Sequence, residues 1–74
     1  PAKYDIVTAN LLSQIIIDNI DKLAELLTPT GRLIISGVGE DNASAAEQSF
    51  RDAKLKILDR EEDNGWLGYL LCSF

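Results

Sequence analysis

A short apolar run that leads directly into an amphipathic helix pattern constrains the fold of this chain more than any other feature. Residues 4–9 contain Ile6, Val7 and Ala9, an almost continuous run that is typical of a strand covered on both faces, as in a parallel sheet. From about Leu12 to Leu27, apolar residues recur at helical spacing, which predicts a helix. Its predicted inner face consists of Leu12, Ile15, Ile16, Ile20, Leu23 and Leu27.

A second strand is predicted after a turn that contains a proline. Pro29 cannot continue a helix and disfavours helical geometry at Thr28, so we expect the turn at residues 28–31 to end the first helix. Residues 32–37 then form a strand with a buried run at 33–35. A strand, a helix and a strand with tight connections form a right-handed crossover unit, in which the two strands are parallel.

The remaining residues predict a second helix and a hairpin. Residues 38–42 are expected to form a loop, and residues 43–53 a helix whose inner stripe is Ala43, Ala46, Phe50 and Ala53. Asp41, Asn42, or Ser44 with Glu47 could cap this helix, and the pattern does not choose among them. Residues 55–62 and 66–74 are predicted strands, joined by Asp63-Asn64-Gly65 as a type I′ turn. We therefore predict a single α/β unit over residues 1–74.

Composition excludes several classes of function. The net charge of −5 argues against binding phosphate backbones, so we expect no direct contact with nucleic acid. The chain has no histidine and a single cysteine, Cys72, so neither a zinc site nor an internal disulfide is expected. The apolar runs are too short to span a bilayer. A free thiol and the lack of a signal-peptide pattern favour a cytoplasmic protein.

Asn10 is the residue on which the functional argument depends. In open sheets covered by helices, ligands bind just beyond the carboxyl ends of the strands, and Asn10 follows the first predicted strand directly. Its amide carries both hydrogen-bond donors and an acceptor on a short side chain. Asparagine is also a good helix cap, so capping of the first helix remains an alternative role. Asp5 lies at the opposite end of the strand, where we expect a surface role.

Three stretches of this order resemble a known enzyme family. Residues 4–12, YDIVTANLL, resemble the "FDLVVANIL" stretch of PrmA-type methyltransferases, which modify protein eleven of the large ribosomal subunit. Residues 27–37, LTPTGRLIISG, resemble their "LKPGGRLILSG", and residues 64–70 are similar to their closing "GEWVALVL". The resemblance implies the C-terminal half of a class I S-adenosylmethionine-dependent methyltransferase sheet, a Rossmann-like fold in which the last strand inserts between its two predecessors.

The resemblance also implies site residues. It places Asn10 where amine-modifying relatives carry a catalytic asparagine that contacts cofactor and substrate, and it makes Leu11 and Leu12 candidates for the substrate pocket. No aromatic residue follows Asn10, which favours an aliphatic amine, such as a lysine of the ribosomal protein, over a planar substrate. The glycine-rich turn and the acidic residue that hold S-adenosylmethionine in this family are absent here. Gly37-Val38-Gly39 lacks the third glycine of such a turn, so we expect the chain alone to bind the cofactor weakly.

Two other functions stay open from the sequence. One is a class I methyltransferase that acts on a small molecule or a nucleic acid. The other is a non-catalytic interaction fragment or half of a nicotinamide-binding domain. Trp66 is predicted to pack in the core or on the hairpin, with a place in a substrate wall as the alternative. Cys72 is predicted to act as a small buried apolar residue. Because half of the family's sheet is absent, we expect the isolated chain to self-associate or to fold loosely.

Overall fold

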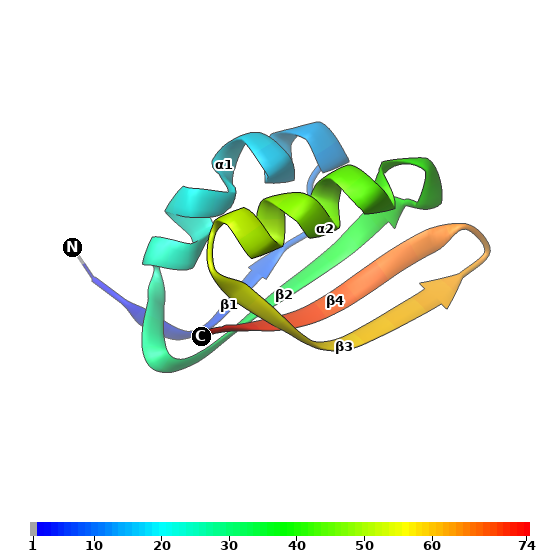
Figure 1. Cartoon of the computed structure of the whole chain (residues 1–74). Coiled ribbons are helices and arrows are strands. Elements are labelled where there is room, and N and C mark those ends of the chain that lie inside the picture. Colours follow the sequence, from blue (N-terminus) through cyan, green and yellow to red (C-terminus); the bar gives the residue numbers. More distant parts are fainter. Residues whose placement is uncertain (1) are drawn as a thin grey trace.

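The computed structural model describes residues 2–74, which form one four-stranded sheet with both helices on the same face (Figure 1). The strand order is β1-β2-β4-β3, with β1 parallel to β2, and β4 antiparallel to both of its neighbours. The α/β class is confirmed, and so is the insertion of the last strand between its two predecessors. The elements are β1 (Tyr4–Ala9), α1 (Ser13–Glu25), β2 (Leu27–Gly39), a short 3₁₀ helix η1 (Glu40–Asn42), α2 (Ala43–Asp52), β3 (Leu55–Asp63) and β4 (Trp66–Ser73).

Helix α1 is shorter than the sequence pattern predicts. It begins after Leu12 and ends at Glu25, so the predicted limits of 12 and 27 are wrong. Leu27 instead pairs with Tyr4 at the start of β2, and the backbone N–H of Tyr4 donates to the carbonyl of Leu26 at 2.6 Å. The helix therefore stops before Pro29, because strand pairing with β1 already takes up residues 26 and 27. The predicted turn at residues 28–31 and the predicted strand bounds of 32–37 are wrong, because β2 runs from Leu27 to Gly39, with a shift in its register to β1 between Leu27 and Arg32.

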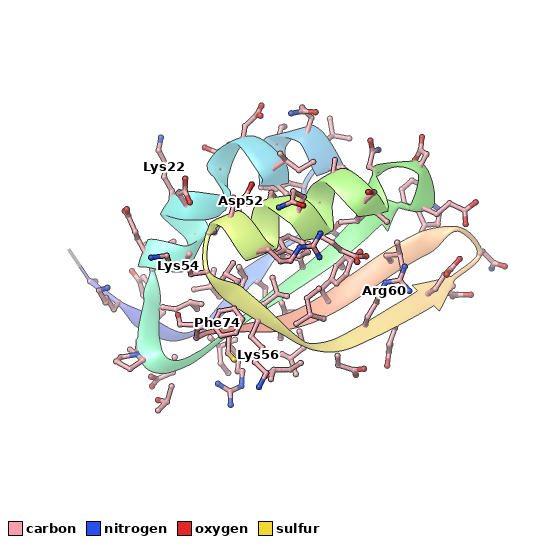
Figure 2. The ribbon with its side chains drawn as sticks, in the orientation of Figure 1. Lys22, Asp52, Lys54, Lys56, Arg60 and Phe74 are labelled. Atoms are coloured by element: carbon pink, nitrogen blue, oxygen red, sulfur yellow. The ribbon has the colours of Figure 1, made fainter. Side chains whose placement is uncertain are left out.

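The core lies between the two helices and the sheet. Ile16 and Ile20 of α1 are buried, and Ala46 and Phe50 of α2 are buried beside them. They pack on the inward-facing residues of the strands, which are Ala9, Leu27, Leu33, Ile35, Val38, Leu55, Leu67, Tyr69 and Leu71. Leu12 and Ile15 are exposed, contrary to the predicted inner face, because Leu12 precedes the helix and Ile15 lies on its outer side. Lys22 projects from α1 away from the sheet (Figure 2).

The opposite face of the sheet is uncovered. Ile6 of β1 is 66% exposed and Ile34 of β2 is 41% exposed, so the prediction of a first strand covered on both faces is wrong for this chain. The physical reason is that α1 and α2 both lie on the other face (Figure 1). A shallow groove of about 320 Å³ runs over this face, between Ile34 and Leu70 and beside Asp59 and Glu61.

The hairpin forms as its sequence predicts. Asn64 and Gly65 have φ angles of 52° and 84°, the left-handed pair that a type I′ turn requires. Residues 38–42 are not one loop, because β2 continues through Gly39 and η1 follows it. Asn42 stands at the cap position of α2 but makes no capping hydrogen bond with its side chain.

Candidate functional site

An open cleft of about 840 Å³ lies beyond the carboxyl ends of β1 and β2. Ligands of helix-covered open sheets bind at such an edge, so this cleft is a better candidate site than the groove on the uncovered face. Three segments line it, from the β1–α1 junction, the β2–η1 junction and the start of β4. They contribute Asn10, Leu11, Leu12, Ser13, Gln14, Ile15, Gly37, Gly39, Asp41, Asn42 and Trp66.

Asn10 directly follows Ala9, the last residue of β1, and lines this cleft. Ala9 is buried and pairs with Ile35, whereas Asn10 is exposed and has left the sheet. Leu12, with φ −57° and ψ 142°, occupies the cap position of α1 and no side chain caps the helix, so the capping role for Asn10 is wrong. Within residues 2–74 no side-chain hydrogen bond involves Asn10. Its amide is therefore available to a ligand.

Two glycines of β2 form the floor of the cleft. The β2–β4 register shifts between Ile35 and Val38, and Gly37 in this bulge has a φ of 81°. A methyl group placed on Gly37 would lie 2.9 Å from Oδ1 of Asn10, and one on Gly39 would lie 2.8 Å from Oδ1 of Asp41. Both glycines therefore allow a polar side chain to approach the backbone closely.

Trp66 belongs to the cleft and not to the core. It is 60% exposed, and Cζ3 of its ring lies 3.8 Å from the position of a methyl group on Gly39. The predicted core role is therefore wrong, whereas a place in a substrate wall, the alternative left open by the sequence, stays a prediction. The sequence feature that indicates an exposed Trp66 is its position directly after the Asn64–Gly65 turn, where a strand residue is least covered. Asp41 and Asn42 were also missed, although they follow a strand at the same edge.

The other predicted residues lie as follows. Leu11 and Leu12 line the cleft, and their contact with a substrate stays a prediction. Asp5 is exposed at the far end of β1, where its carboxylate accepts a 2.7 Å hydrogen bond from Thr28. Cys72 is a free, partly buried thiol. Residues 2–74 contain no cluster of histidine, cysteine or acidic side chains suited to a metal ion, and in the same residues neither helix is long and apolar enough to cross a membrane.

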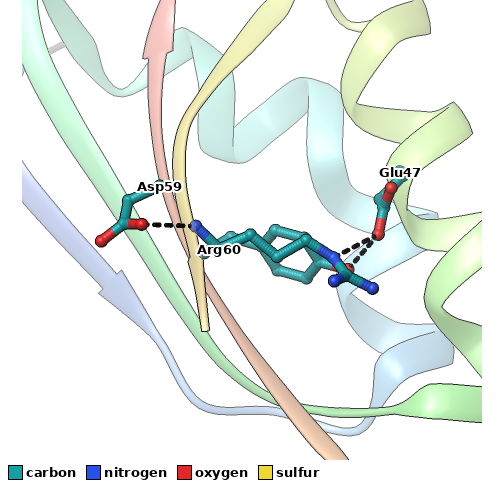
Figure 3. A network of polar contacts seen from close by, with 4 residues as sticks. Glu47, Asp59 and Arg60 are labelled. Atoms are coloured by element: carbon teal, nitrogen blue, oxygen red, sulfur yellow. Dashed lines mark hydrogen bonds and ion pairs between the residues drawn. The ribbon is translucent and has the colours of Figure 1, made fainter. Parts of the chain in front are cut away.

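A polar network joins α2 to the β3–β4 hairpin (Figure 3). Trp66 is the first β4 residue of this hairpin. Glu47 of α2 accepts hydrogen bonds from the Tyr69 hydroxyl at 2.6 Å and from Nε of Arg60 at 3.1 Å, and the carboxylate of Asp59 accepts the backbone N–H of Arg60 at 2.9 Å. The hydrogen bond from Tyr69 lowers the pKa of Glu47 below its ordinary value. Burial, and then the bond to Glu47, raises the pKa of Tyr69 to about 12. The network fixes the hairpin relative to α2.

Known proteins match nearly the whole chain. The family model described as ribosomal protein L11 methyltransferase (PrmA) matches residues 1–71. Ribosomal protein L11 methyltransferases of Dictyoglomus thermophilum and Staphylococcus aureus are 36% and 34% identical over 86% and 88% of the chain. A crystal structure of the ribosomal protein L11 methylase of Lactobacillus delbrueckii subsp. bulgaricus superimposes with a TM-score of 0.93 and 26% identity, over 97% of this chain and 37% of that one. The chain spans 21% of the length of each of the two curated relatives.

Proposed function

Because the chain belongs to the ribosomal protein L11 methyltransferase (PrmA) family, we propose that it forms the C-terminal part of a catalytic domain that methylates a lysine amine of that ribosomal protein. The observation that carries the proposal is the unpaired amide of Asn10 in the cleft beyond β1. Residues 1–74 would then be a partial domain. The free cysteine is in keeping with a cytoplasmic enzyme.

The residues around Asn10 suit one end of S-adenosylmethionine. The amide of Asn10 and the exposed side chains of Leu11 and Leu12 would hold a group that is partly polar and partly apolar. When bound, the cofactor supplies a methyl group that a neutral amine nitrogen can attack, with the electrons of the broken bond remaining on sulfur. We propose that the remaining contacts to the cofactor come from sequence outside this chain.

The cleft offers a physical route to a reactive amine. A lysine arrives as an ammonium ion, and the carboxylate of Asp41 and the exposed ring of Trp66 would attract it. Burial against Leu11 and Leu12 would lower the amine pKa, since desolvation disfavours the charged form. The amide oxygen of Asn10 would then accept an N–H of the neutral amine and orient its lone pair. Proton release to water suffices, which agrees with the lack of histidine.

The same surface argues against a nucleic-acid substrate. Asp41 lies in the cleft, and the neighbouring edge of the sheet carries Asp59, Glu61, Glu62 and Asp63, all exposed. These carboxylates would repel a phosphate backbone. A basic protein segment that presents a lysine fits this charge better.

Replacing Asn10 with alanine in the full-length enzyme tests the proposal. We expect kcat/KM for methylation of the ribosomal protein to fall about 10²-fold, because an unaligned amine loses most of the benefit of positioning. Asn19→Ala is the matched control, since Asn19 lies on α1 outside the cleft and its amide donates only to the carbonyl of Ile15, at 2.8 Å. An unchanged kcat/KM in Asn10→Ala would remove Asn10 from this role.

A further inference from the structure

A methyl group added to Gly37 would meet one atom of another residue within the range 2–74. Gly37 lies in the β2 bulge with a φ of 81°, and a methyl group placed on it would lie 2.9 Å from Oδ1 of Asn10. Apart from its own chain neighbours, no other heavy atom of the described residues lies within 4 Å of that position. A methyl group at position 37 would therefore collide with Asn10 and with no other residue of the range 2–74.

The amide of Asn10 is not held in place by hydrogen bonds within residues 2–74. The helix that follows is not capped by it. Close approach to the backbone of Gly37 is thus a contact that restricts where Oδ1 can point. Because Oδ1 is the far end of a movable side chain, an added methyl group would turn the amide away without breaking the fold.

We propose that Gly37 is a positioning residue for methyl transfer, because its missing side chain lets the amide of Asn10 lie over the β2 bulge and face the cleft. The inference rests on the proposed function and extends it to a second residue on a neighbouring strand. It also gives Gly37-Val38-Gly39 a role as the floor of the cleft. Gly37 would position the side chain of Asn10, and Gly39 would position that of Asp41.

Gly37→Ala in the full-length enzyme tests the inference, and Gly65→Ala is its matched control. Gly65 has nearly the same φ, 84°, but a methyl group there meets only Glu40, at 3.7 Å or more, and Gly65 does not line the cleft. Both variants carry the strain of an alanine at positive φ, so we expect similar losses in Tm. We expect kcat to fall 10- to 100-fold in Gly37→Ala, with KM for the ribosomal protein within about twofold. Gly65→Ala should keep kcat within about twofold.

A double variant shows whether Gly37 acts through Asn10. In the Asn10→Ala background, adding Gly37→Ala should change kcat by less than about twofold, because the amide that it displaces is gone. An equal loss of kcat in both backgrounds would overturn the inference, and so would a Gly37→Ala enzyme whose kcat matches that of Gly65→Ala.

A readout without activity separates this inference from the proposed function. In protein labelled with ¹⁵N at asparagine, the side-chain amide resonances of Asn10 should shift in Gly37→Ala and stay in place in Gly65→Ala. If they shift while Asn10→Ala keeps full activity, the positioning contact holds and the catalytic proposal fails. If they do not shift, Gly37 does not position Asn10, and the inference is overturned whatever the activity of Asn10→Ala.

Discussion

Replacing Tyr69 with phenylalanine removes one hydrogen bond from the α2–hairpin network and leaves the packing intact. The ring stays edge-on to Phe50, at a centroid distance of 5.0 Å and an interplanar angle of 74°. What is lost is the 2.6 Å hydrogen bond from the hydroxyl to the carboxylate of Glu47. Hydrogen bonds to charged groups contribute about 1.5–3 kcal/mol. Because Glu47 keeps Arg60 as a partner, we expect the loss to be at the lower end of this range. Tyr69→Phe should therefore lower the free energy of unfolding by about 1.5 kcal/mol.

The sign of the pH dependence follows from the raised pKa of Tyr69. Its value in the folded protein is about 12 against an ordinary 10.0, so its contribution to stability is complete below pH 10 and is lost as the pH rises toward 12. Urea unfolding of the full-length protein at pH 8 and pH 11 measures both effects. At pH 8 Tyr69→Phe should be the less stable protein, and the difference should shrink at pH 11. Arg60→Gln is the control, because its ion pair with Glu47 is at the surface and its loss should lower the stability less than Tyr69→Phe does. A Tyr69→Phe protein as stable as the parent at pH 8 would refute the reasoning.

Three further predictions concern the cleft, a helix end and the uncovered face. Trp66→Leu should raise KM for the ribosomal protein about fivefold with kcat nearly unchanged, since an exposed cation–π contact contributes about 1 kcal/mol. Its control is Tyr4→Leu, which removes an exposed aromatic side chain outside the cleft and should leave KM unchanged in the same steady-state assay. Lys54→Gly should raise the free energy of unfolding by about 1 kcal/mol, because Lys54 follows α2 at a φ of 61° that favours glycine, and a lower urea midpoint would contradict this. The isolated chain should self-associate in analytical ultracentrifugation, and Ile34→Lys should weaken that association; a sharp monomeric two-state melt of the isolated chain would show this expectation to be wrong.

Local chemistry made much of the fold predictable. The hairpin follows from Asn64 and Gly65, whose adjacent positive φ angles few other residue pairs adopt as readily. Helix α2 begins at Ala43, as its apolar spacing indicates, and buries Ala46 and Phe50. These features depend on residues close together in the sequence, so a single sequence suffices to find them.

Contacts between distant segments were not predictable in the same way. The end of α1 is set by the pairing of Leu27 with Tyr4, which no helical spacing records. The exposure of Trp66 depends on what the start of β4 meets across the sheet. In the candidate site, Asn10 was found because it directly follows a strand, whereas its contact with Gly37 joins two strands and emerges only from the coordinates.

The insertion of β4 between β2 and β3 has a consequence for synthesis. On a growing polypeptide, Asn10 and Gly37 emerge before β4, and the β2 backbone keeps an unpaired edge until the segment after the Asn64–Gly65 turn has been made. The cleft therefore gains Trp66 as its last wall, when that late segment docks. A translation product that stops before Trp66 would contain the amide and its glycine floor, yet the β2 edge would stay unpaired and the cleft would lack its Trp66 wall.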